Sequence, residues 1–252
     1  MKTRPVMVPG LSSAGFLRRV NSMQLKDQVI VVTGAFGALG RAVCAQCLTE
    51  GARVVALDRA ETNAAAAHAY RLDIGGVDLT DAAQTGAAIE RAIARFAQID
   101  GLVNVAGGFT WQTVADGSAA DWQSMYALNV ATAVVTTQAA LPHLLQRQTA
   151  RIVNIGANAA LKGSAGMGPY TASKAAVLRL TESLADELKD KGVNVNAVLP
   201  SIIDTVQNRA DMPKAEHDRW VTPEALAEVI VFLLGPGARA ITGALIPVTG
   251  RV

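Results

Sequence analysis

Short runs of apolar, β-branched residues alternate along this chain with longer stretches whose apolar positions recur at helical spacing. The runs predict strands at 28–32, 53–57, 70–77, 101–105, 151–155, 193–199 and 241–248. The longer stretches predict helices at 41–50, 82–97, 119–145, 175–188 and 223–234. Such alternation is typical of a parallel sheet with helices on both faces. We therefore expect an α/β fold, a single-domain doubly wound parallel sheet over residues 25–252, since the sequence shows no repeat and no internal linker.

The stretch from Pro200 to Val221 is the longest connection without a clear period. It follows the carboxyl end of a predicted strand, where open α/β sheets bind their ligands. Long irregular segments in compact domains are often lids over such sites. We expect a substrate lid at about 200–221, in which Met212 and Trp220 supply apolar surface, and a loop without a binding role is the alternative.

Composition and charge narrow the class of protein. Half of the 252 residues are hydrophobic, the mean hydropathy is +0.26 and 17% are charged, which suits a large core. No apolar run reaches the ~20 residues of a membrane span, so we expect no membrane contact and a cytoplasmic protein. Five of the 23 basic residues and none of the 21 acids lie in residues 1–26. The rest of the chain has no basic excess, which argues against nucleic acid as a partner.

The first 24 residues contain Pro, Gly, Ser and Arg without a clean period, and they lack the apolar core of a secretory signal. We expect a flexible basic N-terminal extension, or a natural start of the chain at Met23. A targeting segment is the alternative, because the stretch is basic, acid-free and contains Ser12 and Ser13.

The cysteines and histidines point to no particular chemistry. Cys44 and Cys47 lie three residues apart on a predicted helix, where small buried hydrophobes are expected and a redox Cys-x-x-Cys pair is the alternative. His68, His143 and His217 are scattered without the spacing of metal ligands, so we expect no metal site.

A glycine-rich turn follows the first predicted strand. It runs Thr33-Gly-Ala-Phe-Gly-Ala-Leu-Gly40 and leads into a helix, while Asp58 closes the second strand. Glycines let the backbone approach a pyrophosphate, a helix N-terminus attracts it, and an acid about 20 residues further on accepts the ribose hydroxyls. Because Asp58 would repel a 2′-phosphate, NAD(H) is the expected cofactor. The neighbouring Arg59 could let NADP(H) bind as well.

Tyr170 and Lys174 lie one helical turn apart, directly after the Gly-rich run 162–169, so their side chains should share a helix face. A free phenol has a pKa of about 10 and carries protons poorly near neutrality. A neighbouring ammonium favours the phenolate and should lower the pKa of Tyr170. The pair predicts a proton donor or acceptor, and a tyrosine packed on the lysine stem is the ordinary alternative.

Together these motifs resemble the short-chain dehydrogenase/reductase family over about residues 25–252. The resemblance also rests on Asp78, Asn104-Val-Ala-Gly107, Asn129 and Pro200. It implies a Rossmann fold that binds NAD(P), a small-molecule substrate, and a homodimer or homotetramer formed through helices such as 119–145 and 167–190.

The resemblance also implies roles for single residues. Tyr170 would be the general acid or base, Lys174 would lower its pKa and bind the nicotinamide ribose, and Asn129 would hold a water in a proton relay. The implied cofactor contacts are Gly34, Phe36, Gly37, Ala38, Leu39, Gly40, Asp58, Asp78, Leu79, Asn104, Ala106, Gly107, Tyr170, Lys174, Pro200 and Ile203.

One position departs from the family pattern. Most members carry a Ser thirteen residues before the Tyr, which hydrogen-bonds the substrate oxygen, and this chain has Ala157 there. Losing such a donor can cost ~3 kcal/mol of transition-state stabilisation. Asn158 or Ser164 could replace the hydroxyl, the substrate could do without it, or the protein could bind cofactor without turnover as a regulator. The presence of both Tyr170 and Lys174 argues against the regulator.

Within the family the sequence is similar to dihydropteridine reductases, which have Ala at that position and reduce a quinonoid dihydropterin with NADH. The similarity covers several short stretches, which are 37–40, 105–108, 157–167, 197–200 and the lid residues 204–223. Asn104 and Asn129 follow the general family pattern instead, which leaves a broader substrate range open. Phe109 or Trp111 could stack on a flat substrate, and packing within the lid region is the alternative.

We therefore expect an NAD(P)H-dependent oxidoreductase with activity like that of a dihydropteridine reductase. A carbonyl or alcohol oxidoreductase in which Asn158 or Ser164 replaces the missing Ser is the alternative. The expected substrate contacts are Phe109, Ala157, Asn158, Ser164 and Trp220.

Overall fold

The computed structural model describes residues 23–62 and 69–252. The basic segment predicted to be a flexible extension lies outside the described residues except for Met23 and Gln24, and so does His68. The flexibility of that segment and its possible role in targeting stay predictions.

Seven parallel strands form one sheet in the order β3-β2-β1-β4-β5-β6-β7. They are β1 Val29–Thr33, β2 Arg53–Leu57, β3 Arg71–Ile74, β4 Gly101–Asn104, β5 Ala150–Ile155, β6 Val193–Pro200 and β7 Leu245–Val248. The strand order reverses between β1 and β4, which places a ligand-binding crevice at their carboxyl ends. The predicted doubly wound parallel sheet is confirmed.

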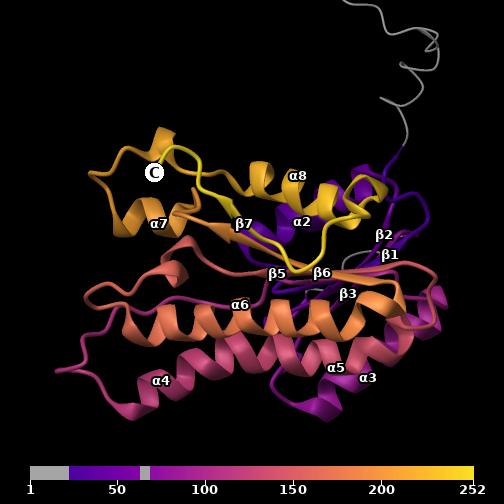
Figure 1. Ribbon diagram of the computed structural model, residues 1–252, viewed down its shortest axis with the longest axis horizontal. Coiled ribbons are helices and arrows are strands. Elements are labelled where there is room, and N and C mark those ends of the chain that lie inside the picture. Colours follow the sequence, from indigo (N-terminus) through magenta and orange to yellow (C-terminus); the bar gives the residue numbers. More distant parts are fainter. Residues whose placement is uncertain (1–22, 63–68) are drawn as a thin grey trace, which may run out of the picture.

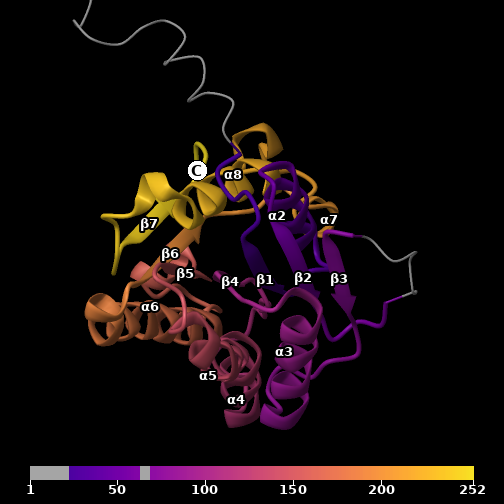
Figure 2. The ribbon, with the colours of Figure 1, turned by 90° about the vertical axis from the view of Figure 1, so that its right-hand side faces the viewer.

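Helices cover both faces of this sheet (Figure 1 and Figure 2). Helices α2 (Ala38–Thr49) and α8 (Pro223–Leu234) pack against each other on one face. The other face carries α3 (Ala82–Phe96), α5 (Thr132–Leu144) and α6 (Gly168–Leu188), with α4 (Ala119–Tyr126) beside α6. Each strand of the sheet's centre is therefore covered on both sides.

The core explains why the strands are apolar runs and not alternating patterns. Along β1, Ile30 and Val32 belong to the cluster under α2 and α8, while Val29 and Val31 belong to the cluster under α3 and α5. All four side chains are fully buried. Burying a side chain of this size stabilises the fold by roughly 1.5–3 kcal/mol, so both faces of the strand contribute.

Several element boundaries differ from those predicted. The single helix predicted at 119–145 is divided into α4 and α5 by a π-helical turn, Ala127–Ala131. The helix predicted at 175–188 begins earlier, at Gly168, with Pro169 in its first turn, where the missing N–H costs nothing. The last strand is shorter than predicted and begins only at Leu245, after a left-handed Gly243.

The start of α8 agrees with its sequence signal. The Thr222 hydroxyl accepts a hydrogen bond from the Ala225 amide at 3.2 Å, and Pro223 occupies the first turn. This confirms Thr222 as the N-cap.

The segment predicted to be an irregular lid contains a short helix, α7 (Val206–Asp211), and a 3₁₀ turn, His217–Arg219. The sequence pattern did not predict α7, because six residues are less than two helical turns and show no recognisable apolar periodicity. The two ends of the segment meet, since the Asp204 amide donates to the Val221 carbonyl at 2.8 Å and the Val221 amide to the Ile202 carbonyl. The segment thus projects from a narrow neck, as a lid would.

Within the described part of the chain, the structure holds no helix with the length and apolar character needed to cross a bilayer. The same residues contain no cluster of three or more His, Cys, Asp or Glu side chains arranged to bind a metal ion.

The cysteines lead to the first testable expectation. Cys44 and Cys47 are fully buried and free, and burial raises the pKa of the Cys44 thiol to about 12 and that of Cys47 further still. Because thiolates are the reactive form, neither thiol should react with iodoacetamide or a disulfide reagent at pH 8 in the native protein. Both should be labelled in urea, as detected by mass spectrometry. Rapid labelling or an oxidised pair in the native protein would contradict this and restore the redox interpretation.

Candidate active site

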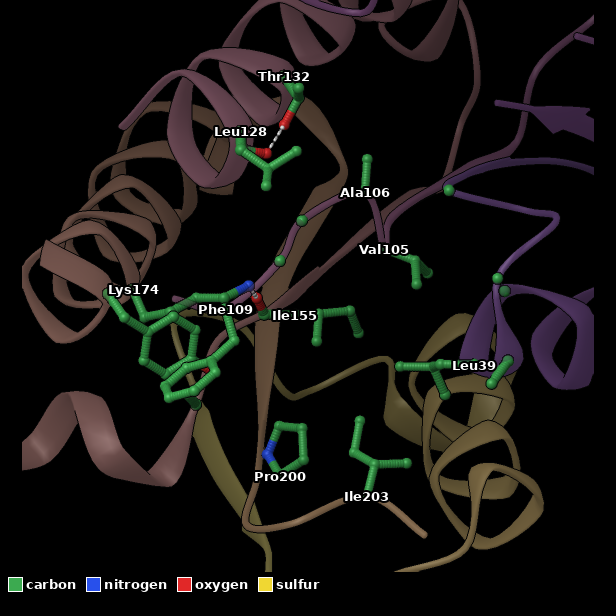
Figure 3. A pocket seen from close by; sticks show the side chains of 18 of the residues that line it. Leu39, Val105, Ala106, Phe109, Leu128, Thr132, Ile155, Lys174, Pro200 and Ile203 are labelled. Atoms are coloured by element: carbon green, nitrogen blue, oxygen red, sulfur yellow. Dashed lines mark hydrogen bonds between the residues drawn. The ribbon is translucent and has the colours of Figure 1, made fainter. Parts of the chain in front are cut away.

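A cleft of about 1350 Å³ opens at the carboxyl end of the sheet (Figure 3). Its walls come from the glycine turn after β1, the ends of β2, β4, β5 and β6, the start of α6, and the lid. Its volume exceeds the few hundred to a thousand Å³ of a typical small-ligand pocket, which suits a dinucleotide together with a substrate.

The glycine turn is shaped by close approaches of the backbone. Gly34 has φ +59°, and a Cβ there would lie 2.9 Å from the backbone of Ala106. A Cβ on Gly40 would lie 2.1 Å from the Gly34 carbonyl oxygen. A Cβ on Gly37 would instead meet only that oxygen, at an ordinary 3.4 Å. The protein fold itself therefore requires Gly34 and Gly40, and leaves open space at Gly37.

That space lies at the N-terminus of α2, where Gly37 is the N-cap without a side-chain hydrogen bond and the first turn holds no acid. Unpaired N–H groups and the positive end of the helix dipole suit a pyrophosphate. The predicted contacts Phe36, Ala38 and Leu39 line the same end of the cleft. These residues fit a bound dinucleotide.

Asp58 lies at the end of β2 and faces the turn. One of its carboxylate oxygens accepts a hydrogen bond from the Phe36 amide at 2.8 Å, and the other accepts one from the Ala60 amide at 2.9 Å. Arg59 beside it is exposed and also lines the cleft. The acid thus holds the turn in shape and lines the cleft, and its contact with the ribose stays a prediction.

On the next wall, Asp78 and Leu79 line the cleft, and the cofactor contacts that the resemblance implies for them stay predictions. Hydrogen bonds from the hydroxyl and amide of Thr80 lower the pKa of the Asp78 carboxyl, so it is charged at neutral pH. Further along, Ala106, Gly107, Pro200 and Ile203 also lie in the lining.

Tyr170 and Lys174 both face the cleft from the first turns of α6. Lys174 is 5% exposed, and its amine donates a hydrogen bond to the Ile155 carbonyl at 2.8 Å, at the end of β5 (Figure 3). Burial lowers the pKa of the Lys174 amine to about 8 and raises the pKa of the Tyr170 phenol to about 12. Desolvation disfavours the charged form of each group.

The phenol pKa corrects one expectation. We predicted that Lys174 would lower the pKa of Tyr170, but desolvation dominates and raises it. The Lys174 amine donates its hydrogen bond to the Ile155 carbonyl. In the protein alone Tyr170 therefore keeps its proton at neutral pH and is suited to donate it.

Asn129 lies in the π-helical turn between α4 and α5. Its carbonyl oxygen accepts from the Gly108 amide at 2.9 Å, and its amide donates to the Gly108 carbonyl at 3.1 Å and to the Ser173 hydroxyl at 3.0 Å. The side chain thus ties the loop after β4 to α6. The expected role in a water relay stays a prediction.

The ring of Phe109 meets the ring of Tyr170 edge-on, with centroids 4.9 Å apart and planes at 81°. Phe109 is 56% exposed and lines the cleft. It is therefore available both to shield the phenol from water and to contact a substrate. Trp111, the other aromatic proposed to stack on the substrate, is not part of the cleft lining.

The remaining predicted residues divide into two groups. Ala157 and Asn158 line the cleft at the end of β5. Ser164 is exposed and lies outside the lining, because the loop carries it away before α6 begins. Of the two possible replacements for the missing hydroxyl, only Asn158 faces the cleft.

Two more residues lie elsewhere than predicted. Trp220 is 7% exposed and packs on the His217 ring, with centroids 4.5 Å apart, so it supports the base of the lid and does not contact the cleft. Asn104 is buried in β4, where its amide donates to Asn154 at 2.9 Å and to Thr137 at 3.2 Å. It braces the strand and is not part of the lining.

The cleft also contains residues that the sequence analysis did not name as site residues. Ser124, Leu128 and Thr132 face it from α4, the π-helical turn and α5. No motif marks these three, because their positions depend on how distant segments fold together. Met167, directly before α6, and Asn208, in the lid, also face the cleft, and the sequence pointed to them only as members of the similar stretches 157–167 and 204–223.

Comparison with known proteins is consistent with this geometry. A family model described as short chain dehydrogenase matches residues 28–216. The 2-(S)-hydroxypropyl-CoM dehydrogenase 3 of Xanthobacter autotrophicus is 36% identical, over 91% of this chain and 98% of that one. The 3-ketoacyl-(acyl-carrier-protein) reductase of Brucella melitensis, solved in complex with NADH, is 27% identical with a TM-score of 0.79, over 90% and 98% of the chains. ElxO, solved with NADP bound, is 26% identical with a TM-score of 0.81, over 89% and 98%.

The assignment of Tyr170 as proton donor is testable by substitution. Tyr170→Phe removes the phenol oxygen and keeps the ring that packs on Phe109. We expect kcat to fall by about 10²–10⁴-fold, the range for loss of a general acid, while the Kd for NADH changes little. Steady-state kinetics and fluorescence titration measure the two effects. Full activity of this variant would contradict the assignment.

Cofactor preference gives a second test at Asp58. Asp58→Asn keeps an oxygen that can accept from the Phe36 amide, whereas Asp58→Ala removes it. Because both variants lose the charge that opposes a 2′-phosphate, both should shift the ratio of NADPH to NADH affinity toward NADPH, by roughly tenfold or more. Asp58→Ala should in addition lower the melting temperature. An unchanged affinity ratio in both variants would mean that the acid does not face the ribose.

Proposed function

The chain belongs to the short-chain dehydrogenase family and is an NAD(P)-dependent oxidoreductase, and we propose that it reduces a flat, uncharged, conjugated substrate such as a quinonoid dihydropterin. None of the relatives named above is a dihydropteridine reductase, so this specificity rests on the cleft of the chain itself.

The proposal rests on the lack of a free cation, and of the family's hydroxyl donor, among the described side chains that surround Tyr170 in the cleft. The charged residues of the cleft lining are Asp58, Arg59, Asp78 and Lys174. The first three lie at the dinucleotide end, and the amine of Lys174 is engaged by the Ile155 carbonyl. In the lid, Arg209 forms a bidentate ion pair with Asp204, with one N–O distance of 2.7 Å. Arg209 is not part of the cleft lining. The described residues thus provide no free cation beside the phenol for an anionic substrate.

The second part of the wall is Ala157, whose methyl group cannot donate a hydrogen bond. Reduction of a ketone concentrates negative charge on one oxygen, and a missing donor there can cost ~3 kcal/mol. A quinonoid ring spreads the charge over a conjugated system, so it depends less on such a donor. Phe109 offers a flat apolar surface next to Tyr170 on which that ring could pack.

The residues of the cleft would divide the work as follows. Bound NADH supplies the hydride for the two-electron reduction. Tyr170 donates the accompanying proton from its phenol oxygen to a ring nitrogen and regains a proton from solvent. The amine of Lys174 would stay bound to the Ile155 carbonyl one turn after Tyr170. The glycine turn and Asp58 would hold the dinucleotide.

A carbonyl or alcohol oxidoreductase is the second candidate. Asn158 lines the cleft next to Ala157 and could supply the hydrogen bond that the missing Ser would give. The names of two relatives, a hydroxypropyl-CoM dehydrogenase and a ketoacyl reductase, also favour this class. A regulator that binds cofactor without turnover has less support, because Tyr170 and Lys174 both face the cleft.

Three further properties belong to the proposal. NAD(H) is preferred over NADP(H) because Asp58 lines the ribose end, and the protein is cytoplasmic.

Self-association uses α4 and α6, since Trp122 and Tyr126 leave apolar surface exposed on α4 beside α6 (42% and 55%). A homodimer or homotetramer would bury this surface, which size-exclusion chromatography with light scattering can measure.

Substrate preference decides between the two candidates. NADH oxidation is measured with quinonoid dihydropterin and with a panel of neutral and anionic ketones. We expect turnover of the pterin, and weaker turnover of ketones that rises with Ala157→Ser, by up to about 10²-fold if the new hydroxyl reaches the oxyanion. Asn158→Ala should leave pterin reduction unchanged. Turnover of ketones alone, with a large loss in Asn158→Ala, would establish the carbonyl reductase instead.

A further inference from the structure

The loop between β4 and α4 is fixed at both of its ends. At the start, Gly108 exchanges two hydrogen bonds with Asn129. At the other end, the Asp121 carboxylate accepts hydrogen bonds from the amide and hydroxyl of Ser118 and closes a capping box on α4. Phe109, which lies against Tyr170, belongs to the part between these anchors.

A second set of contacts holds that middle part. The backbone amide of Gln112 donates to the Gly166 carbonyl at 2.7 Å, and Gln112 forms an isolated parallel bridge with Met167. Met167 in turn accepts hydrogen bonds from the amide and hydroxyl of Thr171, both at 2.8 Å, in the first turn of α6. The loop is therefore connected to the helix that carries Tyr170.

Trp111 covers this junction. Gly166 has φ +72° and is buried, and a Cβ there would lie 2.1 Å from the indole ring of Trp111. Only a glycine lets the indole lie this close to the backbone. Trp111 is 61% exposed and does not line the cleft, so its packing on Gly166 lies outside the substrate site.

We propose that Trp111 is a positioning residue, which packs on Gly166 and thereby holds the loop so that Phe109 stays against the ring of Tyr170. Phe109 is then the wall of the substrate site, and Trp111 acts only through it. The proposal goes beyond the substrate assignment, although its kinetic part rests on Tyr170 as the proton donor. Desolvation of the phenol fits the same arrangement, since the Phe109 ring covers one edge of it.

Hydrogen exchange tests this packing without any substrate. Trp111→Ala and Gly166→Ala should both speed exchange in the peptide that contains the Gln112 amide, because opening the loop frees that amide from the Gly166 carbonyl. Gly163→Ala is the matched control for Gly166→Ala, because Gly163 lies in the same segment before α6 and a Cβ there would meet nothing within 4 Å. Unchanged exchange in Trp111→Ala, or equal acceleration in Gly163→Ala, would overturn the proposal.

Gly166→Ala also strains the backbone at positive φ, so a double-mutant cycle isolates the contact with the indole. In the Trp111→Ala background the Gly166→Ala change should have a smaller effect on exchange than in the wild type. Equal effects in both backgrounds would mean that the two residues do not act on each other.

Kinetics with whichever substrate the panel identifies give the functional arm. Trp111→Ala should lower kcat/KM by roughly ten- to hundredfold, as small misplacements at a reacting centre do, with the Kd for NADH unchanged. Trp111→Phe should restore part of it. If Trp111 stacked on the substrate directly, KM would rise while exchange in the free protein stayed as in the wild type, and that result would also refute the proposal. Failure of pterin turnover would not affect the exchange result.

Discussion

A buried hydrogen bond from the amine of Lys174 to the carbonyl of Ile155 joins α6 to the end of β5. Burying an ammonium is unfavourable unless a partner compensates for the lost water, so this carbonyl fixes the axial position of the helix. Tyr170, one turn earlier, then faces the cleft. The loop after β4 must also fit around the amine: a Cβ on Gly107 would lie 3.2 Å from the Lys174 nitrogen and 2.5 Å from the Asn129 side-chain oxygen. The chemistry of one side chain thus constrains three segments of the fold.

Much of this architecture could be predicted from the sequence, because it follows from local rules. Largely apolar runs such as 28–32 indicate strands buried on both faces, and the turn that ends in Gly40 indicates a dinucleotide site. Both features depend on neighbouring residues only. The π-helical turn at 127–131 was missed because it depends on tertiary packing. The helix at 167–190 implied by the family resemblance begins close to the observed start at Gly168.

The candidate site was less predictable, and the reason is geometric. Ser164 and Trp220 were chosen from their positions near the motif and in the lid, but residue spacing does not determine which way a loop or a side chain points. Trp220 is buried at the neck of the lid because the Ile202–Asp204 and Val221 backbones meet there. The pKa of Tyr170 was predicted in the wrong direction, because sequence shows the neighbouring charge of Lys174 but not the burial that outweighs it.

The desolvation of the Tyr170 phenol and the apolar residues of the cleft wall both favour the reductive direction of the reaction. A phenol that holds its proton firmly suits the reductive direction, in which it must donate. The Phe109 ring lies against the phenol, and Ala157 places in the cleft wall a methyl group that cannot donate a hydrogen bond. Under the proposed function the substrate spreads its own charge and does not need the family's hydroxyl, and the closeness of Phe109 to Tyr170 is the feature on which this proposal depends.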